Sequence, residues 1–294
     1  MGQGVGVASA CASATVVNAI ATGKGASFGI DLRVMSKVKL TSDKKISGRV
    51  LGVKGESPKL IEICVKKVLN HLGLIKSYGA LIETGSDIPI AVGLSSSSAA
   101  ANAAVMATFA ALDKKPKPKL VLDLAIDAAF EAKVTITGAL DDAAASFYGH
   151  GVVTDNLKQK ILNHFELDPK LMVLIHVPPS KFYTSKTSSI ALKPIKEVIE
   201  MVHNMARRGE VMKALTINGL LYASSLGYDP MVAIEAISKG ALAAGLSGTG
   251  PATIALAKPR DAIIIAREWQ AWNGRIIITR PAMKGARVEG LDAG

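Results

Sequence analysis

The sequence predicts two α+β domains that share a cleft. The chain of 294 residues is long enough for two domains of ordinary size, each with its own core. Strand-like and helix-like patterns occur in both halves, and the texture of the sequence changes near residues 150–170. Each half also contains one glycine-rich segment next to an apolar element. We therefore expect domains at residues 1–155 and 156–294, with a functional site between them.

The first half combines strands with three helices. Apolar and polar residues alternate over 34–40, which predicts a half-buried strand, and GRVLGV near 48–53 predicts a second one. Residues 58–73 have apolar side chains at helical spacing and end at Gly73, a common helix stop. The remaining elements expected here are a strand and loop over 78–89, an alanine-rich helix that follows the serines at 95–98, and a helix over 120–133.

The second half is expected to alternate strands and helices. LMVLIHVPP at 171–179 predicts a buried strand that ends at two prolines. Residues 194–227 predict two helices that are broken at Arg208–Gly209. The remaining elements are a helix over 229–241, a strand in ATIALAK, a helix in DAIIIAREWQAW and a closing strand in RIIITRP.

The composition indicates a globular protein with anionic ligands. Hydrophobic residues make up 49% of the chain and charged residues 20%. The formal net charge of +11 favours anionic partners such as phosphorylated or carboxylated metabolites. The basic residues are scattered in short runs without interleaved aromatic residues, so nucleic-acid binding is not expected. KKPKPK at 114–119 contains two prolines and is expected to be a solvated loop.

Other patterns limit the compartment and the metal chemistry. Cys11 and Cys64 are the only cysteines and show no pairing pattern, which excludes a thiolate zinc site and favours a reducing compartment. The five histidines have no metal-ligand spacing. The apolar runs are too short or too interrupted for a membrane span, and the N-terminus lacks the basic region of a signal peptide. A cytoplasmic protein without a membrane partner is therefore expected.

The segment GLSSSS at 93–98 stands directly before the alanine-rich helix. A helix start leaves backbone N–H groups unpaired and therefore attracts anions. Serines at this position cap those donors and offer hydroxyls to phosphate or magnesium, and Gly93 lets a ligand approach the backbone. The alternative is an ordinary serine-capped helix, but four consecutive serines exceed what one cap requires.

A second glycine-rich segment, GLSGTG at 245–250, precedes a predicted strand. Gly245, Gly248 and Gly250 can expose successive N–H groups to an anion, and Ser247 and Thr249 add hydroxyls. A tight turn would rarely need so many glycines. The Walker pattern GxxxxGK[ST] and the dinucleotide fingerprint are both missing. Two anion-binding loops suggest a nucleotide and a phosphoryl acceptor.

These two segments carry a family resemblance. PIAVGLSSSSAA at 89–100 resembles the second motif, and AAGLSGTGPA at 243–252 the third motif, of the galactokinase, homoserine kinase, mevalonate kinase and phosphomevalonate kinase (GHMP) superfamily. Residues 14–40 differ from the usual first motif and resemble the start of archaeal-type shikimate kinases, as does TGALDDAAASFYG at 137–149. The resemblance covers essentially the whole chain.

The resemblance implies both a fold and a reaction. The fold is a GHMP-kinase-like pair of domains, with an N-terminal left-handed β-α-β domain, a C-terminal ferredoxin-like domain and the active site in the cleft between them. The reaction is transfer of the γ-phosphoryl group of ATP to the 3-hydroxyl of shikimate, which gives shikimate 3-phosphate and ADP in aromatic amino acid synthesis. The alternative is another small-molecule kinase of the superfamily, such as homoserine kinase. A non-enzymatic anion-binding or nucleic-acid-binding protein is disfavoured, because binding phosphate needs no carboxylates beside it.

The resemblance also implies where ATP and Mg²⁺ bind. Ser97 or Ser98 would supply a hydroxyl to Mg²⁺, and Glu131 would complete the metal's shell, since Mg²⁺ binds one or two carboxylates together with phosphate and water. Glu131 could instead lie on a solvated helix face. The residues expected to hold ATP are Pro89, Ile90, Ala91, Val92, Gly93, Leu94, Ser95, Ser96, Ser97, Ser98 and Ala99.

The catalytic base is expected at Asp141 or Asp142, because a carboxylate near the acceptor hydroxyl can take its proton. An Asp-Asp pair is also a common start of a helix. The family pattern of Asp followed by an amide residue favours Asp141. Counting back from Gly149 without a gap favours Asp142, so the choice stays open, with Asp141 slightly preferred.

The acceptor is expected to contact the segment that resembles the shikimate-type first motif. Lys24 lies between two glycines and is the first candidate for meeting a carboxylate or phosphate, with Arg33 in reserve. The residues assigned to the acceptor are Thr22, Lys24, Ser27 and Asp31, together with Gly245, Ser247, Gly248, Thr249 and Gly250 of the second loop. A polar loop with Tyr183, Thr184, Ser185 and Lys186 is a further candidate.

Overall fold

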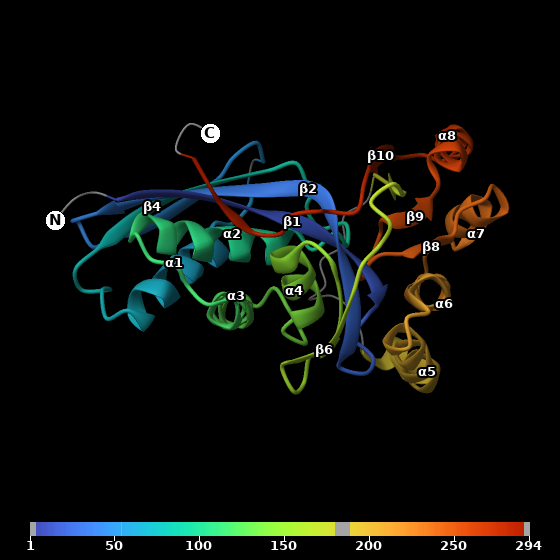
Figure 1. The fold of residues 1–294 in the computed structure, drawn as a ribbon, viewed down its shortest axis with the longest axis horizontal. Coiled ribbons are helices and arrows are strands. Elements are labelled where there is room, and N and C mark those ends of the chain that lie inside the picture. Colours follow the sequence, from blue (N-terminus) through green and yellow to red (C-terminus); the bar gives the residue numbers. More distant parts are fainter. Residues whose placement is uncertain (1–3, 54, 180–188, 291–294) are drawn as a thin grey trace.

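A computed structural model describes residues 4–53, 55–179 and 189–290 of the chain. Two sheets, each with its own helices, lie side by side along the long axis of the molecule (Figure 1). The predicted α+β class is confirmed, because both units combine mostly antiparallel sheets with helices.

The first sheet is built around a long hairpin. Strand β1 (Val5–Val17) pairs antiparallel with β2 (Lys24–Thr41), and the sheet order is β11-β1-β2-β4-β3. Strand β5 extends it by pairing with both β2 and β6. Among the described strands, only β3 and β4 pair in parallel. The other strands are β3 (Ile46–Val50), β4 (Gly79–Ser86), β5 (Gly151–Asp155), β6 (Lys160–Phe165) and β11 (Arg287–Glu289).

Four helices cover one face of this sheet (Figure 1). They are α1 (Lys59–His71), α2 (Ser96–Ala111), α3 (Pro118–Ala132) and α4 (Leu140–Tyr148). Helix α2 lies at the centre and is alanine-rich because it packs closely on β1. A Cβ at Gly6 of β1 would collide with the α2 backbone at Ala107. Small side chains on both elements therefore bring the start of α2 against the sheet.

The second unit has the strand order expected of a ferredoxin-like domain. Its antiparallel sheet runs β10-β7-β9-β8, so that the fourth strand of the unit is followed by the first, third and second. The strands are β7 (Met172–Val177), β8 (Ala243–Leu246), β9 (Thr253–Ala257) and β10 (Arg275–Thr279). The helices are α5 (Lys196–Arg207), α6 (Val211–Leu226), α7 (Met231–Ser238) and α8 (Pro259–Glu268), with 3₁₀ turns at Ser189–Ile195 and Trp269–Ala271.

The two units share one hydrophobic core. Buried residues of β1, such as Val16, pack in the same cluster as Leu215 of α6 and Leu246 of β8. The predicted boundary between residues 155 and 156 falls in the turn between β5 and β6, which pair in the first sheet, and β11 also returns to that sheet. The boundary stays a prediction, since the chain crosses between the units more than once.

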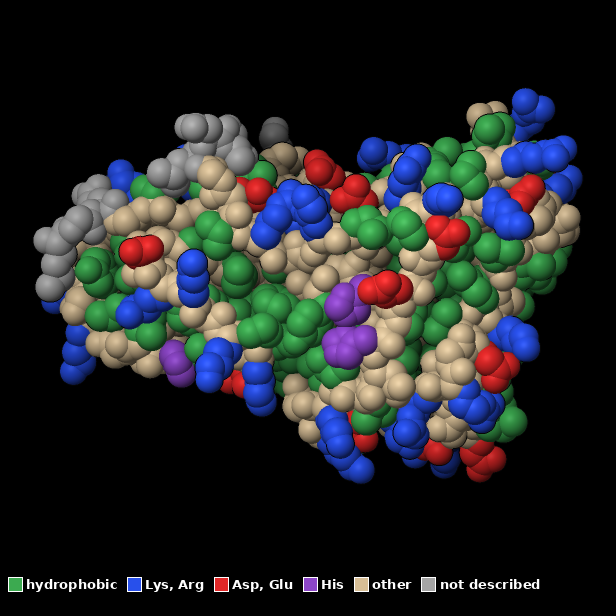
Figure 2. Space-filling view, in the orientation of Figure 1, with side chains coloured by type: hydrophobic (Ala, Val, Ile, Leu, Met, Phe, Trp, Pro, Cys, Tyr) green, Lys and Arg blue, Asp and Glu red, His purple; other side chains and the backbone are tan. Residues whose placement is uncertain are grey.

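The surface shows no concentration of one charge on the face seen in Figure 2. Lysine and arginine side chains are spread over both units and alternate with acidic and apolar ones. Within the described ranges, every helix is too short or too polar to span a bilayer.

Candidate active site

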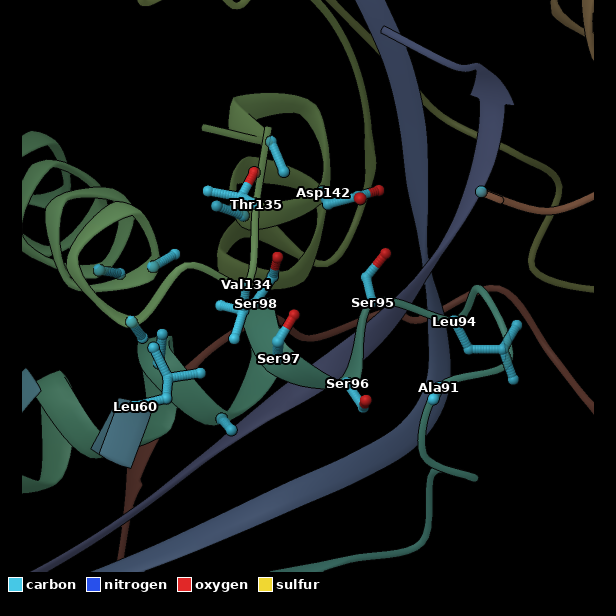
Figure 3. Close-up of a pocket in the computed structure, with 18 of the residues that line it drawn as sticks. Leu60, Ala91, Leu94, Ser95, Ser96, Ser97, Ser98, Val134, Thr135 and Asp142 are labelled. Carbon is cyan, nitrogen blue, oxygen red and sulfur yellow. The ribbon is translucent and has the colours of Figure 1, made fainter. Parts of the chain in front are cut away.

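A cavity of about 350 Å³ lies where the start of α2, the end of β1 and the β8–β9 loop meet. The first unit supplies most of its wall, and Gly248 and Thr249 supply the contribution of the second unit. Figure 3 shows Ser95 to Ser98 along one side of it, with Asp142 and the Val134–Thr135 segment opposite. Residues more than 200 positions apart in sequence therefore line one space, as Thr15 and Gly248 do.

The GLSSSS segment turns sharply before α2 begins. Gly93 has a φ of +89° and Ser95 a left-handed φ of 54°. The expectation that serine caps this helix is wrong for Ser95, which makes no side-chain cap hydrogen bond, because its hydroxyl bonds to Asp142 instead. The N–H groups of the first turn of α2 are therefore not satisfied by a serine cap, and a helix start of this kind attracts an anion.

The second glycine-rich loop is fastened to the first. The Ser247 hydroxyl donates to the carbonyl of Gly93 at 2.7 Å and accepts from the backbone N–H of Thr15 at 3.2 Å. The N–H of Gly248 donates to the Thr15 hydroxyl at 2.9 Å. A side chain at Gly93 would collide with the Ser247 carbonyl, so glycine is required at this contact. The two loops that the sequence singles out border the same cavity.

The two aspartates at the start of α4 have different surroundings. Asp142 lines the cavity, and one of its carboxylate oxygens accepts from Ser27 at 2.8 Å and from Ser13 at 3.2 Å. Asp141 also reaches the cavity wall but is only 4% exposed, and Asn156 donates to it at 2.8 Å. Because α4 begins at Leu140, both carboxylates lie in its first turn, where the helix dipole favours negative charge.

Burial dominates the titration of both groups. Loss of solvent and then the neighbouring Asp142 charge raise the pKa of Asp141 to about 7, against the hydrogen bond from Asn156. Loss of solvent also raises the pKa of Asp142, and hydroxyls of Ser27, Ser95 and Ser13 oppose that rise. The pair can therefore hold a proton near neutral pH, which is the range in which a carboxyl group exchanges protons efficiently.

Most of the residues expected to hold ATP line the cavity. Pro89, Val92 and Ala99 do not: Val92 and Ala99 belong to the buried core, and the carbonyl of Val92 accepts from the N–H of Ala252. The eight that do are Ile90, Ala91, Gly93, Leu94, Ser95, Ser96, Ser97 and Ser98.

The residues expected to contact the acceptor are brought to the cavity only in part. Gly248 and Thr249 line it, whereas Ser247 is fully buried beneath them. Gly245 lies in β8, where a side chain would meet Gly219 of α6, and Gly250 packs against Leu246 and Tyr228. These two glycines serve the close packing of the loop instead of lining the cavity.

The first-motif candidates lie away from the cavity. The Thr22 hydroxyl bonds to the backbone of Lys24, and the Lys24 amine points to Glu200 of α5 at 3.9 Å. Asp31 is exposed, and its backbone pairs with Arg280. The reserve candidate Arg33 donates to Ser9 and to the carbonyls of residues 284 and 285. Ser27 is fully buried behind the aspartates.

The loop candidates Tyr183, Thr184, Ser185 and Lys186 lie outside the described residues.

Of the residues expected to bind the metal, some line the cavity and one does not. Ser97 and Ser98 line the cavity, whereas Glu131 does not, and its carboxylate pairs with Lys67 at 3.1 Å. Among the described residues there is no cluster of three or more His, Cys, Asp or Glu side chains that could hold a metal ion by itself. A site with few protein ligands and a phosphate-bearing substrate fits Mg²⁺, which keeps several waters and binds phosphate oxygens.

Several lining residues were not anticipated from the sequence. Thr15 lies near the end of β1, and Asn18 and Ile20 lie in the turn that follows it, in a stretch that has no periodic pattern. An apolar end of the cavity includes Val50 and Leu60. The stretch VTIT at 134–137 also lines the wall. The feature of the sequence that could have indicated this is its position between a predicted helix and Gly138.

The chain resembles known proteins over nearly its whole length. Residues 59–150 match the family described as GHMP kinases N terminal domain, and residues 196–274 match GHMP kinases C terminal. A shikimate kinase of Methanothermobacter thermautotrophicus is 41% identical over 282 residues, which cover 94% of this chain and 95% of that protein. A shikimate kinase of Methanosarcina acetivorans is 42% identical over 277 residues, 93% of each chain.

Solved structures show the same fold at much lower identity. The mevalonate kinase of Methanococcus jannaschii has a TM-score of 0.73 at 17% identity and covers 94% of this chain and 98% of its own. A homoserine kinase of Cytophaga hutchinsonii has a TM-score of 0.71 at 20% identity, with 97% of each chain covered. Since both halves match the family and relatives near 40% identity span nearly the whole length, the chain belongs to the GHMP kinase family.

Proposed function

We propose that this protein is an ATP-dependent shikimate kinase, which transfers the γ-phosphoryl group of ATP to the 3-hydroxyl of shikimate. The observation that carries the proposal is the set of relatives named shikimate kinase, about 40% identical over more than nine-tenths of the chain. The cavity supports it, since two anion-attracting loops and a carboxylate border one space. Homoserine kinase stays the alternative, but the likeness to it at 20% identity concerns the fold.

The triphosphate of ATP binds along the GLSSSS segment. The first turn of α2 offers N–H groups and the positive end of its dipole, and Lys59 and Lys133 add positive charge elsewhere on the cavity wall. The adenine ring occupies the apolar end, against Val50, Leu60 and neighbouring residues. This placement leaves the γ-phosphoryl group near the meeting point of the two loops.

Asp142 is the better candidate for the base. It faces the cavity, whereas Asp141 is nearly buried behind it. In the proposed reaction the Asp142 carboxylate takes the proton of the acceptor hydroxyl as that oxygen bonds to the γ-phosphorus, and the bond from the γ-phosphorus to the oxygen that ADP keeps breaks. Positioning and charge neutralisation supply the rest of the rate, as in other phosphoryl transfers.

Mg²⁺ would be held by the hydroxyls of Ser97 or Ser98 together with the phosphates, where it neutralises charge on the transferred group. Glu131 could join it only by leaving Lys67.

Changing both Ser97 and Ser98 to Ala is expected to raise the Mg²⁺ concentration for half-maximal activity by about tenfold or more, because the metal loses its protein hydroxyls. A titration of activity with Mg²⁺ at fixed ATP measures this. The control is Ser224→Ala, since Ser224 is an exposed serine of α6 that bonds only within its own helix. An unaltered Mg²⁺ dependence in the double variant would remove these serines from the metal site.

A substrate panel tests the function itself. The purified protein with Mg–ATP is expected to release ADP with shikimate, and not with homoserine or mevalonate, in a coupled assay corrected for turnover without acceptor. The product is expected to be shikimate 3-phosphate by mass and ³¹P NMR. Release of ADP with homoserine alone would transfer the assignment to the alternative.

A further inference from the structure

Ser27 of β2 joins the two aspartates by one hydroxyl. Its oxygen lies 2.8 Å from Asp142 Oδ1 and 3.3 Å from Asp141 Oδ2. The side chain is fully buried and does not line the cavity, so its contact is with the carboxylates. A buried hydroxyl between two carboxyl groups must distinguish them, because it has a single proton to give.

The distances indicate which group receives that proton. The shorter contact is a hydrogen bond from Ser27 to Asp142. The contact with Asp141 is then satisfied only if Asp141 Oδ2 carries a proton and donates it to the Ser27 oxygen. The resulting chain is Asp141 Oδ2–H to Ser27 Oγ–H to Asp142 Oδ1, with all its groups in hydrogen-bonding roles.

The other oxygen of Asp141 is held as an acceptor. Asn156 donates to Asp141 Oδ1 at 2.8 Å, and the amide orientation of Asn156 is set by Thr154, which donates to its oxygen at 2.6 Å. Gly25 is needed beside it, because a Cβ there would collide with the Asp141 carboxyl. The proton of Asp141 therefore belongs on Oδ2, the oxygen that faces Ser27.

The charged surroundings favour one shared proton. Most of the groups that surround the two aspartates are neutral: the hydroxyls of Ser13, Ser27 and Ser95 and the amide of Asn156. Tyr222 of α6 also lies near, and the charge of Asp141 helps to raise the pKa of this tyrosine. Among the described residues, no lysine, arginine or histidine forms an ion pair with either aspartate. If both carboxylates were ionised, two buried negative charges with one hydroxyl between them would have no positive charge to balance them.

We propose that Asp141 carries a proton in the resting enzyme and that the Ser27 hydroxyl, held by it, hydrogen-bonds to Asp142 and keeps Asp142 ionised as the base. Asp141 and Ser27 are then positioning residues, and only Asp142 meets the acceptor. This inference rests on the proposed phosphoryl transfer for its kinetic consequences, but the proton on Asp141 is a property of the protein alone.

The kinetic test uses three variants. Asp141→Asn reproduces the proposed state, because its amide oxygen accepts from Asn156 and its NH₂ donates to Ser27. It is expected to lower turnover at neutral pH by less than about tenfold and to leave the acid limb of the pH–kcat profile nearly unchanged, because Asp141 is already uncharged in the proposed state when Asp142 takes up its proton. Ser27→Ala is expected to move that limb to higher pH, because the base loses its shorter hydrogen bond.

Ser13→Ala is the matched comparison for Ser27. Ser13 donates to the same oxygen of Asp142 at 3.2 Å but has no bond to Asp141. Its acid limb is expected to move less than that of Ser27→Ala. A loss of turnover in Asp141→Asn of a hundredfold or more, or equal shifts in the two serine variants, would overturn the proposal.

A stability measurement separates this inference from the function. The pKa of folded Asp141, about 7, lies above its ordinary value of 3.8, so the folded state binds more protons and its stability falls as pH rises between those values. Denaturant unfolding from pH 4 to pH 8 is expected to show that fall in the parent protein and a much smaller one in Asp141→Asn. If the free energy of unfolding fell equally with pH in both proteins, Asp141 would not carry the proposed proton. If the two proteins differed in this way but the parent protein did not phosphorylate shikimate, the proton on Asp141 would be supported and the proposed function would be rejected.

Discussion

Asp142→Asn is expected to lower kcat for shikimate phosphorylation by about 10²–10⁴-fold, with the affinity for Mg–ATP little changed. The amide cannot take a proton from the acceptor, although it still fills the same space at the start of α4. Hydroxyls of Ser13, Ser27 and Ser95 surround this side chain, so an amide oxygen can retain some of their hydrogen bonds. The effect therefore falls on the chemical step.

The measurement combines steady-state kinetics with nucleotide binding by calorimetry. The matched control is Asp123→Asn, because Asp123 forms an exposed ion pair with Lys119 on α3 and does not line this cavity. Its kinetics are expected to equal those of the parent protein. Near-normal turnover in Asp142→Asn would show that this carboxylate is not the base, and a loss of ATP binding would assign it to the nucleotide instead.

Gly93→Ala is expected to lower the free energy of unfolding by about 2–5 kcal/mol and to abolish most activity. Two costs add at this position. The φ of +89° is unfavourable for alanine, and the new Cβ would strike the carbonyl of Ser247. Relief requires the two glycine-rich loops to move apart, which breaks the hydrogen bond from Ser247 to the Gly93 carbonyl. The GLSSSS turn, where ATP is proposed to bind, is then displaced along with the fold.

Gly209→Ala separates strain from collision. Gly209 lies between α5 and α6 with a φ of +88°, but a Cβ there has open space. It is expected to cost only the backbone strain, about 1–2 kcal/mol, with kinetics unchanged. Urea unfolding and ATP-dependent turnover of both variants provide the comparison. If Gly93→Ala cost no more than Gly209→Ala, the contact with Ser247 would not hold the loops together.

The sequence predicted the elements whose patterns are local. The helices at α1 and α3, and the break between α5 and α6 at Gly209, follow from apolar spacing and helix stops. Strand β1 and the first part of β2 were not anticipated, because their Ala, Ser and Gly residues do not alternate. Strand β1 packs against α2 and α4 of the first unit and against α6 of the second, so nearly all its residues are buried.

The candidate site was predicted where one segment carries the signal. Two glycine-rich loops and an aspartate pair are recognisable in short stretches, and they border one cavity. Ser27 was expected to contact substrate because its neighbours resemble a substrate motif. Its partner is instead a carboxyl group more than 100 positions away, which no pattern around residue 27 reveals. The glycines that flank Lys24 predict a contact with the acceptor, yet the Lys24 amine points to Glu200 of α5.

The hydrogen bonds among Thr15, Gly93 and Ser247 have a mechanical consequence. They tie strand β1 and both loops together at the floor of the cavity, above a core that the two units share. A hinge motion that separated the two units would break these hydrogen bonds and expose the apolar side chains of the shared core. Reactants are therefore expected to enter and leave through the open side of the cavity, and the speed of exchange should depend on exposed lining residues such as Val134.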